Sequence, residues 1–233
     1  MNTIDLNEFD GENAFYHFTS RDNYESISLN GLIPSIGDNA NGIEKTSKVF
    51  FSKGNIGFLR ICDVWINWFI YRISLYNSVL KYKDISDEER RQFREDFTNG
   101  LYYTEDNINY AMTWMMEYMK SNIVLKLDIT SEDYDPLDID EAKTHEKEEF
   151  TNRMYLGYIT SSDKVESFNM HTKSGVGVDK EKISKVTTKD DDSALSILKE
   201  IYKEEKEKDN GLEFAFLDRF MNYVNSIDQD IKL

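Results

Sequence analysis

The sequence predicts a domain of the α+β class, and three observations along the chain support this. Short β-rich segments open the chain at residues 14–20 and 49–52, with one short helix between them. From residue 55 the apolar residues recur with a helical period. After residue 121 short strand patterns return, and two helical patterns follow them. This order differs from a regular βαβ alternation, so we expect an α+β fold.

Length and composition are those of a globular protein. The 233 residues are 39% hydrophobic and 13% aromatic, which is enough for a sizeable core. Only two prolines are present, so a stiff proline-rich linker is not expected. We assign residues 1–190 to one domain with a helical insertion at 55–121. Residues 191–233 are expected to form a C-terminal helical extension packed on it.

Capping and turn residues mark where the first strands and the first helix begin and end. Residues 14–20 are aromatic and β-rich, and Ser20 has the short hydroxyl side chain that caps a helix N-terminus. The helix that follows is predicted to close at Gly31, because glycine is favoured just after a helix C-terminus. A polar loop at 35–47 then leads to the second strand at 49–52.

The middle of the chain is predicted to be mainly helical. A wide apolar stripe predicts a helix from residue 55 to about residue 80, and an acidic first turn opens another at 86–97. A methionine-rich stripe at 105–120 predicts a third helix that faces the core. Residues 122–129 alternate and predict a strand.

The last part of the chain mixes strands and helices. Residues 133–148 are acidic and are predicted to be a solvated loop. Three strands and then two helices are expected at residues 150–160, 165–171, 176–186, 195–207 and 212–227.

The charge balance restricts the partners. The chain carries 44 acidic and 28 basic side chains, a net charge of −16 at pH 7. Such a surface repels phosphate, which disfavours a general grip on DNA or RNA but not a basic partner. The single Cys62 cannot form an internal disulfide, and residues 1–10 show no signal peptide. No uncharged run approaches the roughly 20 residues of a membrane span, so we expect a cytoplasmic protein without membrane contact.

Three motif-like patterns fail on their spacing. The run that begins at His145 starts like a zinc-protease motif but has Glu149 where the second histidine is required. The acidic run from Asp133 lacks the glycine at the sixth position of a calcium loop. Gly175-Val176-Gly177 lacks the third glycine and following helix of a dinucleotide loop. No metal site is predicted.

Residues 15–54 resemble the opening of the ADP-ribosyltransferase superfamily. That superfamily includes the poly(ADP-ribose) polymerases, the diphtheria-like toxins and bacterial toxins that modify DNA or protein. The resemblance implies a core of two small, mostly antiparallel sheets and a bacterial or phage toxin-like activity. It rests on an aromatic-His strand, a turn and a second strand: Tyr16-His17-Phe18-Thr19-Ser20, Gly31-Leu32-Ile33-Pro34 and Val49-Phe50-Phe51-Ser52.

The same resemblance implies how NAD is held as a substrate. His17 would hydrogen-bond a ribose hydroxyl, and the backbone of Phe18 would pair with the nicotinamide carboxamide. Phe50 stands where the family usually has a tyrosine that stacks on nicotinamide; a phenyl ring can stack but has no hydroxyl. The other expected cofactor-binding positions are Tyr16, Thr19, Ser20, Phe51 and Ser52, and Tyr102, Tyr103 and Tyr110 are alternative sources of a hydroxyl.

The family also has a catalytic glutamate at the start of a late strand. Cleavage of the nicotinamide–ribose bond develops an oxocarbenium ion, which a fixed carboxylate stabilises. By resemblance Glu149 is the first choice, and Glu148 is the second. The plainer alternatives are that His17 is a packed core residue and that Thr19 and Ser20 cap the following helix.

Three functions remain open. The first is an NAD-dependent mono-ADP-ribosyltransferase whose acceptor is a protein or small molecule rather than nucleic acid. The second is an enzyme similar to RNA 2′-phosphotransferases, which grip phosphates with several arginines; here the arginines are scattered. The third is a non-enzymatic acidic interaction or decoy protein on the same fold. The helical insertion is left as a lid, an acceptor platform or part of the core.

Overall fold

The computed structural model describes residues 1–34, 49–81, 104–130, 132, 134–136, 170–173, 175–189, 191–208 and 211–230. It confirms the α+β class. The strands are β1 (Asn2–Asp5), β2 (Phe15–Ser20), β3 (Phe50–Lys53), β4 (Asn122–Leu127), β5 (Tyr134–Pro136), β6 (Met170–Thr172) and β7 (Ile183–Thr187). The helices are α1 (Arg21–Asn30), α2 (Gly54–Lys81), α4 (Glu105–Ser121), α7 (Ala194–Glu207) and α8 (Leu217–Asp230).

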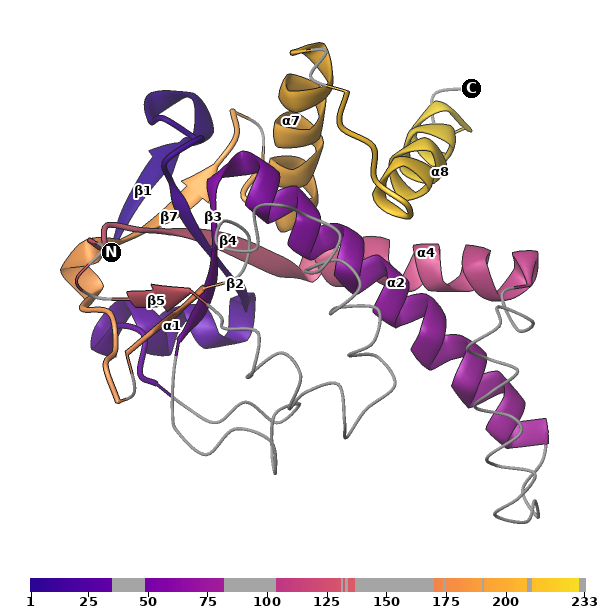
Figure 1. The fold of residues 1–233 in the computed structure, drawn as a ribbon, viewed down its shortest axis with the longest axis horizontal. Helices are drawn as coiled ribbons and strands as arrows, with labels where there is room; N and C mark the ends of the chain where they lie inside the picture. The colour runs from indigo at the N-terminus through magenta and orange to yellow at the C-terminus, as the bar shows by residue number, and fades with distance from the viewer. Residues whose placement is uncertain are drawn as a thin grey trace.

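The strands lie in the order β1-β7-β4-β2-β3-β6-β5. Figure 1 labels each of them except β6. They form two sections that share β3: a five-strand section from β1 to β3, and a short section of β3, β6 and β5. The pair β1–β7 is parallel, and the other pairs are antiparallel. The pairing is therefore mostly antiparallel, as the resemblance implies.

Strand β2 lies at the centre of this order and has a different environment on each face. Successive side chains of a strand point to opposite faces. Tyr16 and Phe18 face the four helices α2, α4, α7 and α8, whereas Phe15 packs with residues of the other face. His17 pairs with Leu125 of β4, whose side chain belongs to the same side as Phe15. His17 is therefore on the face opposite the four helices.

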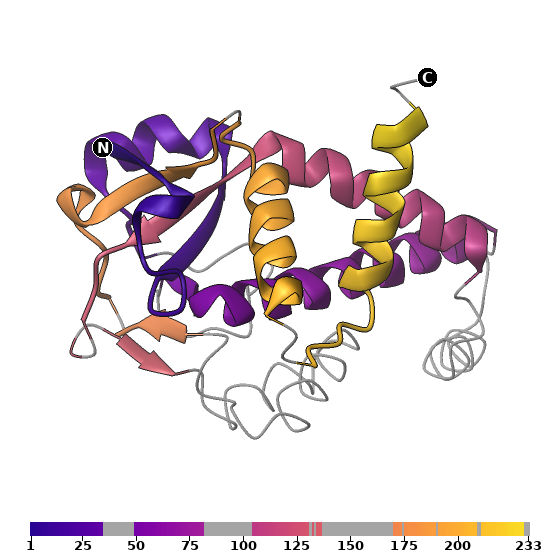
Figure 2. The ribbon, with the colours of Figure 1, turned by 90° about the horizontal axis from the view of Figure 1, so that it is seen from above.

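The four helices form one continuous apolar core on their face of the sheet, here called the helix-side core. α2 and α4 extend away from the sheet, and α7 and α8 contact both of them (Figures 1 and 2). The predicted methionine stripe of α4 is buried, as is the thiol of Cys62. The central members of this core are Tyr16, Leu59, Ile66, Ile70, Met112, Met115, Met119, Leu198 and Phe220.

The opposite face carries a smaller apolar group, here called the pocket-side cluster. It joins α1 and the segments that follow β4 and precede β7. Its buried members are Ile27, Leu32, Val49, Phe51, Ile123, Leu125, Leu127, Ile129, Val178 and Ile183. Since β4 contributes to both faces, it reads in the sequence as a nearly continuous apolar run.

Caps explain where most helices begin. Ser20, Thr104 and Ser193 each accept a hydrogen bond from a backbone N–H in the first turn of α1, α4 and α7. α8 is capped from a distance: Asp63 Oδ1 of α2 accepts hydrogen bonds from Phe216 N at 2.8 Å and Leu217 N at 2.6 Å. Burial of this carboxylate raises the pKa of Asp63, and the two N–H bonds oppose that shift.

Several predicted boundaries are wrong for identifiable reasons. Residues 134–136 lie in the predicted acidic loop but form strand β5, because antiparallel pairing with β6 satisfies their backbone hydrogen bonds. Residues 176–186 are not one strand: a 3-10 turn at Lys180–Lys182 separates the bridge at Val178 from β7. The last helix begins at Leu217 instead of residue 212, where Asp63 caps it.

One strand of the structure was not predicted, and two predicted elements cannot be compared with it. β1 was not expected; it forms because β7 offers it a parallel partner. The predicted helix 86–97 and strand 150–160 lie outside the described residues. Among the helices that are described, none has the length and apolar character needed to span a membrane.

Candidate functional site

His17 lies where the pairing of β2 with β3 ends. The β2–β3 register covers Phe15 opposite Lys53 and Tyr16 opposite Ser52, whereas β2 pairs with β4 along its whole length. One residue further on, the imidazole of His17 reaches the neighbouring strand. Its Nδ1 lies 2.8 Å from the carbonyl oxygen of Phe50. A side-chain bond therefore takes the place of the next ladder contact.

This contact defines the state of the imidazole. A carbonyl oxygen only accepts, so Nδ1 carries the proton and donates it to Phe50. Burial lowers the pKa of His17, and the bond to Phe50 partly opposes this shift. A neutral ring with a protonated Nδ1 has a lone pair at Nε2. His17 is thus held in one orientation by the backbone of β3, an arrangement that suits both a packed structural residue and a hydrogen-bond acceptor.

Tyr16, next to His17, is a core residue of the opposite face. It is 2% exposed, and its hydroxyl donates to Asn55 Oδ1 at 2.7 Å. Asn55 Nδ2 donates in turn to the buried Glu205 of α7 at 3.2 Å. The phenol is therefore part of a buried network that joins β2, α2 and α7. Any contact of Tyr16 with a cofactor would have to use its main chain.

Phe18 also faces the helices, where its ring stacks with that of Tyr118 at 5.8 Å between centroids. The role expected for Phe18 uses its backbone, and all of β2 through Ser20 is paired with β4. Ser20 is the N-cap of α1, with Asn23 N donating to its Oγ at 3.3 Å. For Ser20 the plainer interpretation is thus confirmed. Thr19 is buried on the same side as His17.

The second motif strand contributes mainly to packing. The Phe51 ring meets the Phe15 and Tyr134 rings edge to face, each at 5.6 Å, and Ser52 is buried. Because side chains alternate along a strand, Phe50 and Phe51 point to opposite faces of β3. His17 contacts Phe50 through its carbonyl group.

The structure brings His17 against the backbone carbonyl of Phe50 across the β2–β3 junction. The ring of Phe50, which was expected to stack on nicotinamide, points to the opposite face from Phe51 and therefore away from the His17 side. Glu149 and its alternative Glu148 lie outside the described residues, as do Tyr102 and Tyr103. No group of three metal-ligating side chains occurs in the part of the chain that is described.

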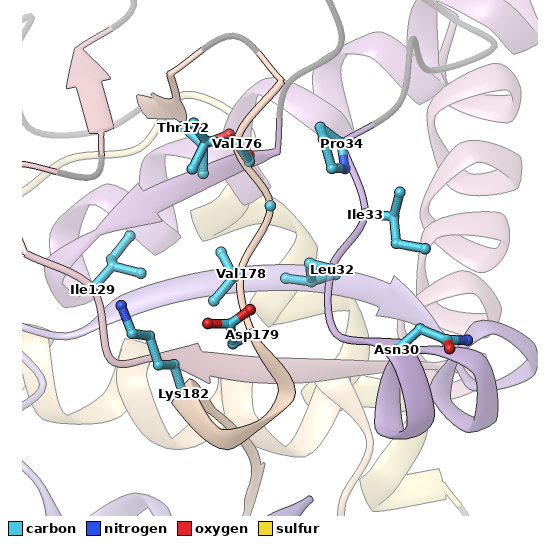
Figure 3. A pocket seen from close by; sticks show the side chains of 11 residues that line it. Asn30, Leu32, Ile33, Pro34, Ile129, Thr172, Val176, Val178, Asp179 and Lys182 are labelled. Atoms are coloured by element: carbon cyan, nitrogen blue, oxygen red, sulfur yellow. Dashed lines mark hydrogen bonds between the residues drawn. The ribbon is translucent and has the colours of Figure 1, made fainter.

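A pocket of about 390 Å³ opens on the same face of the sheet as His17 (Figure 3). Its walls are the Leu32–Pro34 part of the turn motif and the segment before β7. The lining mixes apolar side chains with polar ones, and both kinds occur at its exposed edge. The lining residues are Asn30, Leu32, Ile33, Pro34, Ile129, Thr172, Val176, Gly177, Val178, Asp179 and Lys182. His17 is not one of them.

Two close backbone approaches shape this pocket. Leu32 and Val178 exchange N–H···O bonds of 2.8 and 2.9 Å. Gly31 has φ +75°, and a Cβ atom there would lie 2.3 Å from the carbonyl oxygen of Val178. A Cβ at Gly177 would lie 2.5 Å from the carbonyl oxygen of Leu32. Both glycines are therefore required by this pairing.

The pocket is linked by hydrogen bonds to β3, the strand whose Phe50 carbonyl accepts the bond from His17. Thr172 lines the pocket and exchanges bonds with Val49: Thr172 N donates to Val49 O at 2.9 Å, and Val49 N donates to Thr172 Oγ1 at 3.0 Å. Val49 directly precedes Phe50, whose carbonyl group binds His17. One pair of strands thus supports both the wall of the pocket and the partner of His17.

Sequence reasoning missed the second wall of the pocket. The sequence predicts only a turn at Gly175-Val176-Gly177. The next residue, Val178, pairs with Leu32 across about 145 residues of chain, a contact that strand patterns do not reveal. The glycines were the available signal, since they mark close backbone approach. Comparisons with protein-family models, curated proteins and solved structures found no match to this chain.

Proposed function

We propose that this chain binds NAD on the His17 face of the sheet and is a mono-ADP-ribosyltransferase. The observation that carries the proposal is the bond from His17 Nδ1 to Phe50 O at the end of the β2–β3 ladder. It joins the two motif strands at the residues for which the resemblance implies NAD contacts.

The state of the imidazole suits the role of His17. A ribose hydroxyl needs an acceptor for its proton, and Nε2 of the neutral tautomer supplies a lone pair. Burial, which lowers the pKa of His17, keeps that lone pair available near neutral pH. The bond to Phe50 prevents rotation of the ring, so the acceptor is oriented before the substrate arrives.

The reaction would proceed by displacement at the ribose carbon that bears nicotinamide. The carbon–nitrogen bond breaks, and nicotinamide leaves with the electron pair. The acceptor forms the new bond to the same carbon and loses its proton. Positive charge develops on the ribose in between, and the carboxylate of Glu149, or of Glu148, would stabilise it. Phe50 would act through the carbonyl oxygen that orients His17, because its ring points to the face of β3 opposite Phe51 and so away from the His17 face.

The pocket supports this site by its size and place. At about 390 Å³ it is near the lower end of the range for ligand sites, so it suits one part of a dinucleotide. The turn motif that supports the resemblance forms one of its walls through Leu32 and Pro34. The proposed substrate would extend from this pocket toward His17 on the same face.

The test is release of nicotinamide from NAD, measured together with NAD binding by calorimetry. We expect His17→Ala to weaken binding and Glu149→Ala to abolish turnover while binding persists. Glu181→Ala is the matched control, because Glu181 is exposed in the 3-10 turn. Circular dichroism verifies that each variant is folded. Absence of both NAD binding and turnover in the wild type would refute the proposal.

The acidic interaction protein is the second candidate, and the net charge of −16 favours it. It predicts a partner that binds equally well to wild type and His17→Ala, without turnover of NAD. The phosphotransferase alternative is weaker because described arginines have other partners. Arg21 pairs with Asp192 at 2.6 Å, and Arg60 lies over the Phe214 ring at 5.3 Å.

A further inference from the structure

Helix α4 has a second apolar face that is exposed. Its inner face supplies the methionines of the helix-side core. On the outside, Tyr110, Trp114 and Tyr118 are 53, 54 and 38% exposed. Their spacing of four residues places them along one ridge of the helix. We call these three residues the α4 aromatic ridge. Among the side chains whose exposure the structure describes, those of α4 are the only three large apolar ones exposed on a single helix.

One end of the ridge is rigidly held. The Tyr118 ring stacks on Phe18 of β2 at 5.8 Å with an interplanar angle of 17°. It also meets Phe69 of α2 at 5.4 Å. Trp65 packs edge to face on Phe18 at 4.8 Å. These contacts fix the base of the ridge against both α2 and the central strand. A partner would therefore meet aromatic faces that are already ordered, which lowers the entropy cost of binding.

The charges around the ridge are mostly negative. Asp106 lies one helical turn before Tyr110 on the same ridge, and Glu117 lies three residues after Trp114. Two cations also lie at this helix: Lys120 pairs with Glu117 at 3.0 Å, and Arg219 of α8 pairs with Glu105 in the first turn, so Asp106 carries the negative charge nearest to Tyr110. An aromatic face attracts a cation through its quadrupole, and neighbouring carboxylates add to that attraction. The aromatic rings and the carboxylates therefore both favour a positively charged group.

These charges also discriminate among occupants. A nucleic acid could stack on the rings, but its phosphates would be repelled by the acidic surface. A second copy would bring another net charge of −16 to the same place. A basic protein segment gains from both the rings and the carboxylates. Arginine suits the ridge better than lysine, because its planar guanidinium stacks on aromatic faces and pairs with carboxylates.

We propose that the α4 aromatic ridge is a docking surface for an arginine-rich segment of a partner protein. Guanidinium groups stack on Trp114 and Tyr110 and pair with Asp106; a pair with Glu117 would replace its contact with Lys120. The surface lies on the helix side of β2, opposite the face that carries His17. It operates whether or not the chain turns over NAD.

The test uses the full chain and a fluorescein-labelled peptide of Arg-Gly-Ser repeats, followed by anisotropy, with a Lys-Gly-Ser peptide of equal length beside it. We expect the arginine peptide to bind more tightly than the lysine peptide. Trp114→Ala should weaken binding of the arginine peptide about tenfold. This variant keeps the net charge, so a change in affinity reports the ring and not general attraction between opposite charges.

Matched controls separate the ridge from the rest of the surface. Leu29→Ala removes a side chain that is 63% exposed on α1 and should leave the affinity unchanged. Asp106→Asn should weaken binding more than Glu25→Gln on α1, although both variants remove one charge. Asp106 and Glu25 are both exposed, so neither substitution is expected to unfold the protein.

Four outcomes would overturn the proposal. They are absence of peptide binding, equal affinity of wild type and Trp114→Ala, tighter binding of a single-stranded oligonucleotide than of the arginine peptide, and a dimer in sedimentation that Trp114→Ala dissociates. NAD binding and nicotinamide release by the same variants are measured separately. Failure of the proposed enzyme activity would leave these peptide results unaffected, so the two proposals are distinguishable.

Discussion

The two faces of strand β2 differ in what they do for the protein. On the helix side, Tyr16 is buried among four helices. Its hydroxyl donates a hydrogen bond to Asn55, which in turn donates to Glu205 of α7. On the pocket side, His17 is only partly buried, and the pocket opens beside a smaller apolar cluster. Adjacent residues of one strand thus lie in different surroundings, a packed core on one side and a surface with a pocket on the other.

This separation follows from the geometry of a strand. The side chains of Tyr16 and His17 point in opposite directions, so one can be fixed by packing while its neighbour keeps a free nitrogen. A rigid helix-side core allows the other face to retain a pocket. The following predictions test this division, beginning with the largest expected effect.

Loss of the Tyr16 side chain should cause the largest loss of stability. Tyr16→Ala removes a ring that packs against Phe9 and Phe58, and it leaves a cavity in the helix-side core. We expect the free energy of unfolding to fall by roughly 3–5 kcal/mol, as measured by urea denaturation. Tyr16→Phe keeps the ring but leaves Asn55 without its donor, and should cost roughly 1–3 kcal/mol. Equal losses for the two variants would contradict the cavity explanation.

Asp63 should have the next largest effect, and its effect should depend on pH. Asp63→Ala leaves Phe216 N and Leu217 N without their acceptor, for an expected loss of roughly 1–3 kcal/mol. Asp63→Asn keeps an acceptor oxygen but does not titrate. It therefore isolates the contribution of the proton.

The direction of the pH effect follows from the raised pKa of Asp63. Above the ordinary value of 3.8, the folded state retains a proton that the unfolded chain has already lost. Relative to Asp63→Asn, the wild type should therefore lose stability as pH rises from 3.8 through the raised pKa, and then level off. Urea denaturation across that range measures the difference. A relative gain of the wild type with rising pH would show that the carboxylate is better stabilised than its burial indicates.

Ser20 should have a smaller and purely local effect. Ser20→Ala removes the acceptor for Asn23 N at the start of α1, which should cost about 1 kcal/mol of stability. NAD affinity should stay unchanged, because capping already uses the hydroxyl. A large loss of NAD affinity with little loss of stability would instead return Ser20 to the cofactor-binding set.

His17 should contribute least to stability, and its pKa is the informative quantity. Because burial lowers the pKa of His17 below 6.5, protons bind the unfolded state first as pH falls. Relative to His17→Gln, the wild type keeps its full stability above pH 6.5 and loses it below that value, toward the lowered pKa. NMR titration of the ring protons should show a midpoint below 6.5, with the signal assigned by its absence in His17→Gln. A midpoint above 6.5 would contradict a neutral acceptor.

Local pattern was sufficient for the elements with strong signals. The stripe that begins at residue 55, the methionine pattern of α4 and the aromatic β2 were each predicted within a few residues. Ser20 and Gly31 correctly predicted the ends of α1, because capping is decided within one turn. β1 and β5 were missed because short strands form only where a partner strand offers hydrogen bonds.

The candidate site was only partly predictable for the same reason. The sequence by itself determined the residue types: an imidazole between aromatic residues, a glycine-led turn and a second strand. Only the tertiary structure decided that Phe50 O fixes His17, that Leu32 pairs with Val178, and that Tyr16 belongs to the core. Periodicity and capping act over a few residues of chain. Hydrogen bonds between distant segments depend on how those segments pack, and no local pattern encodes that.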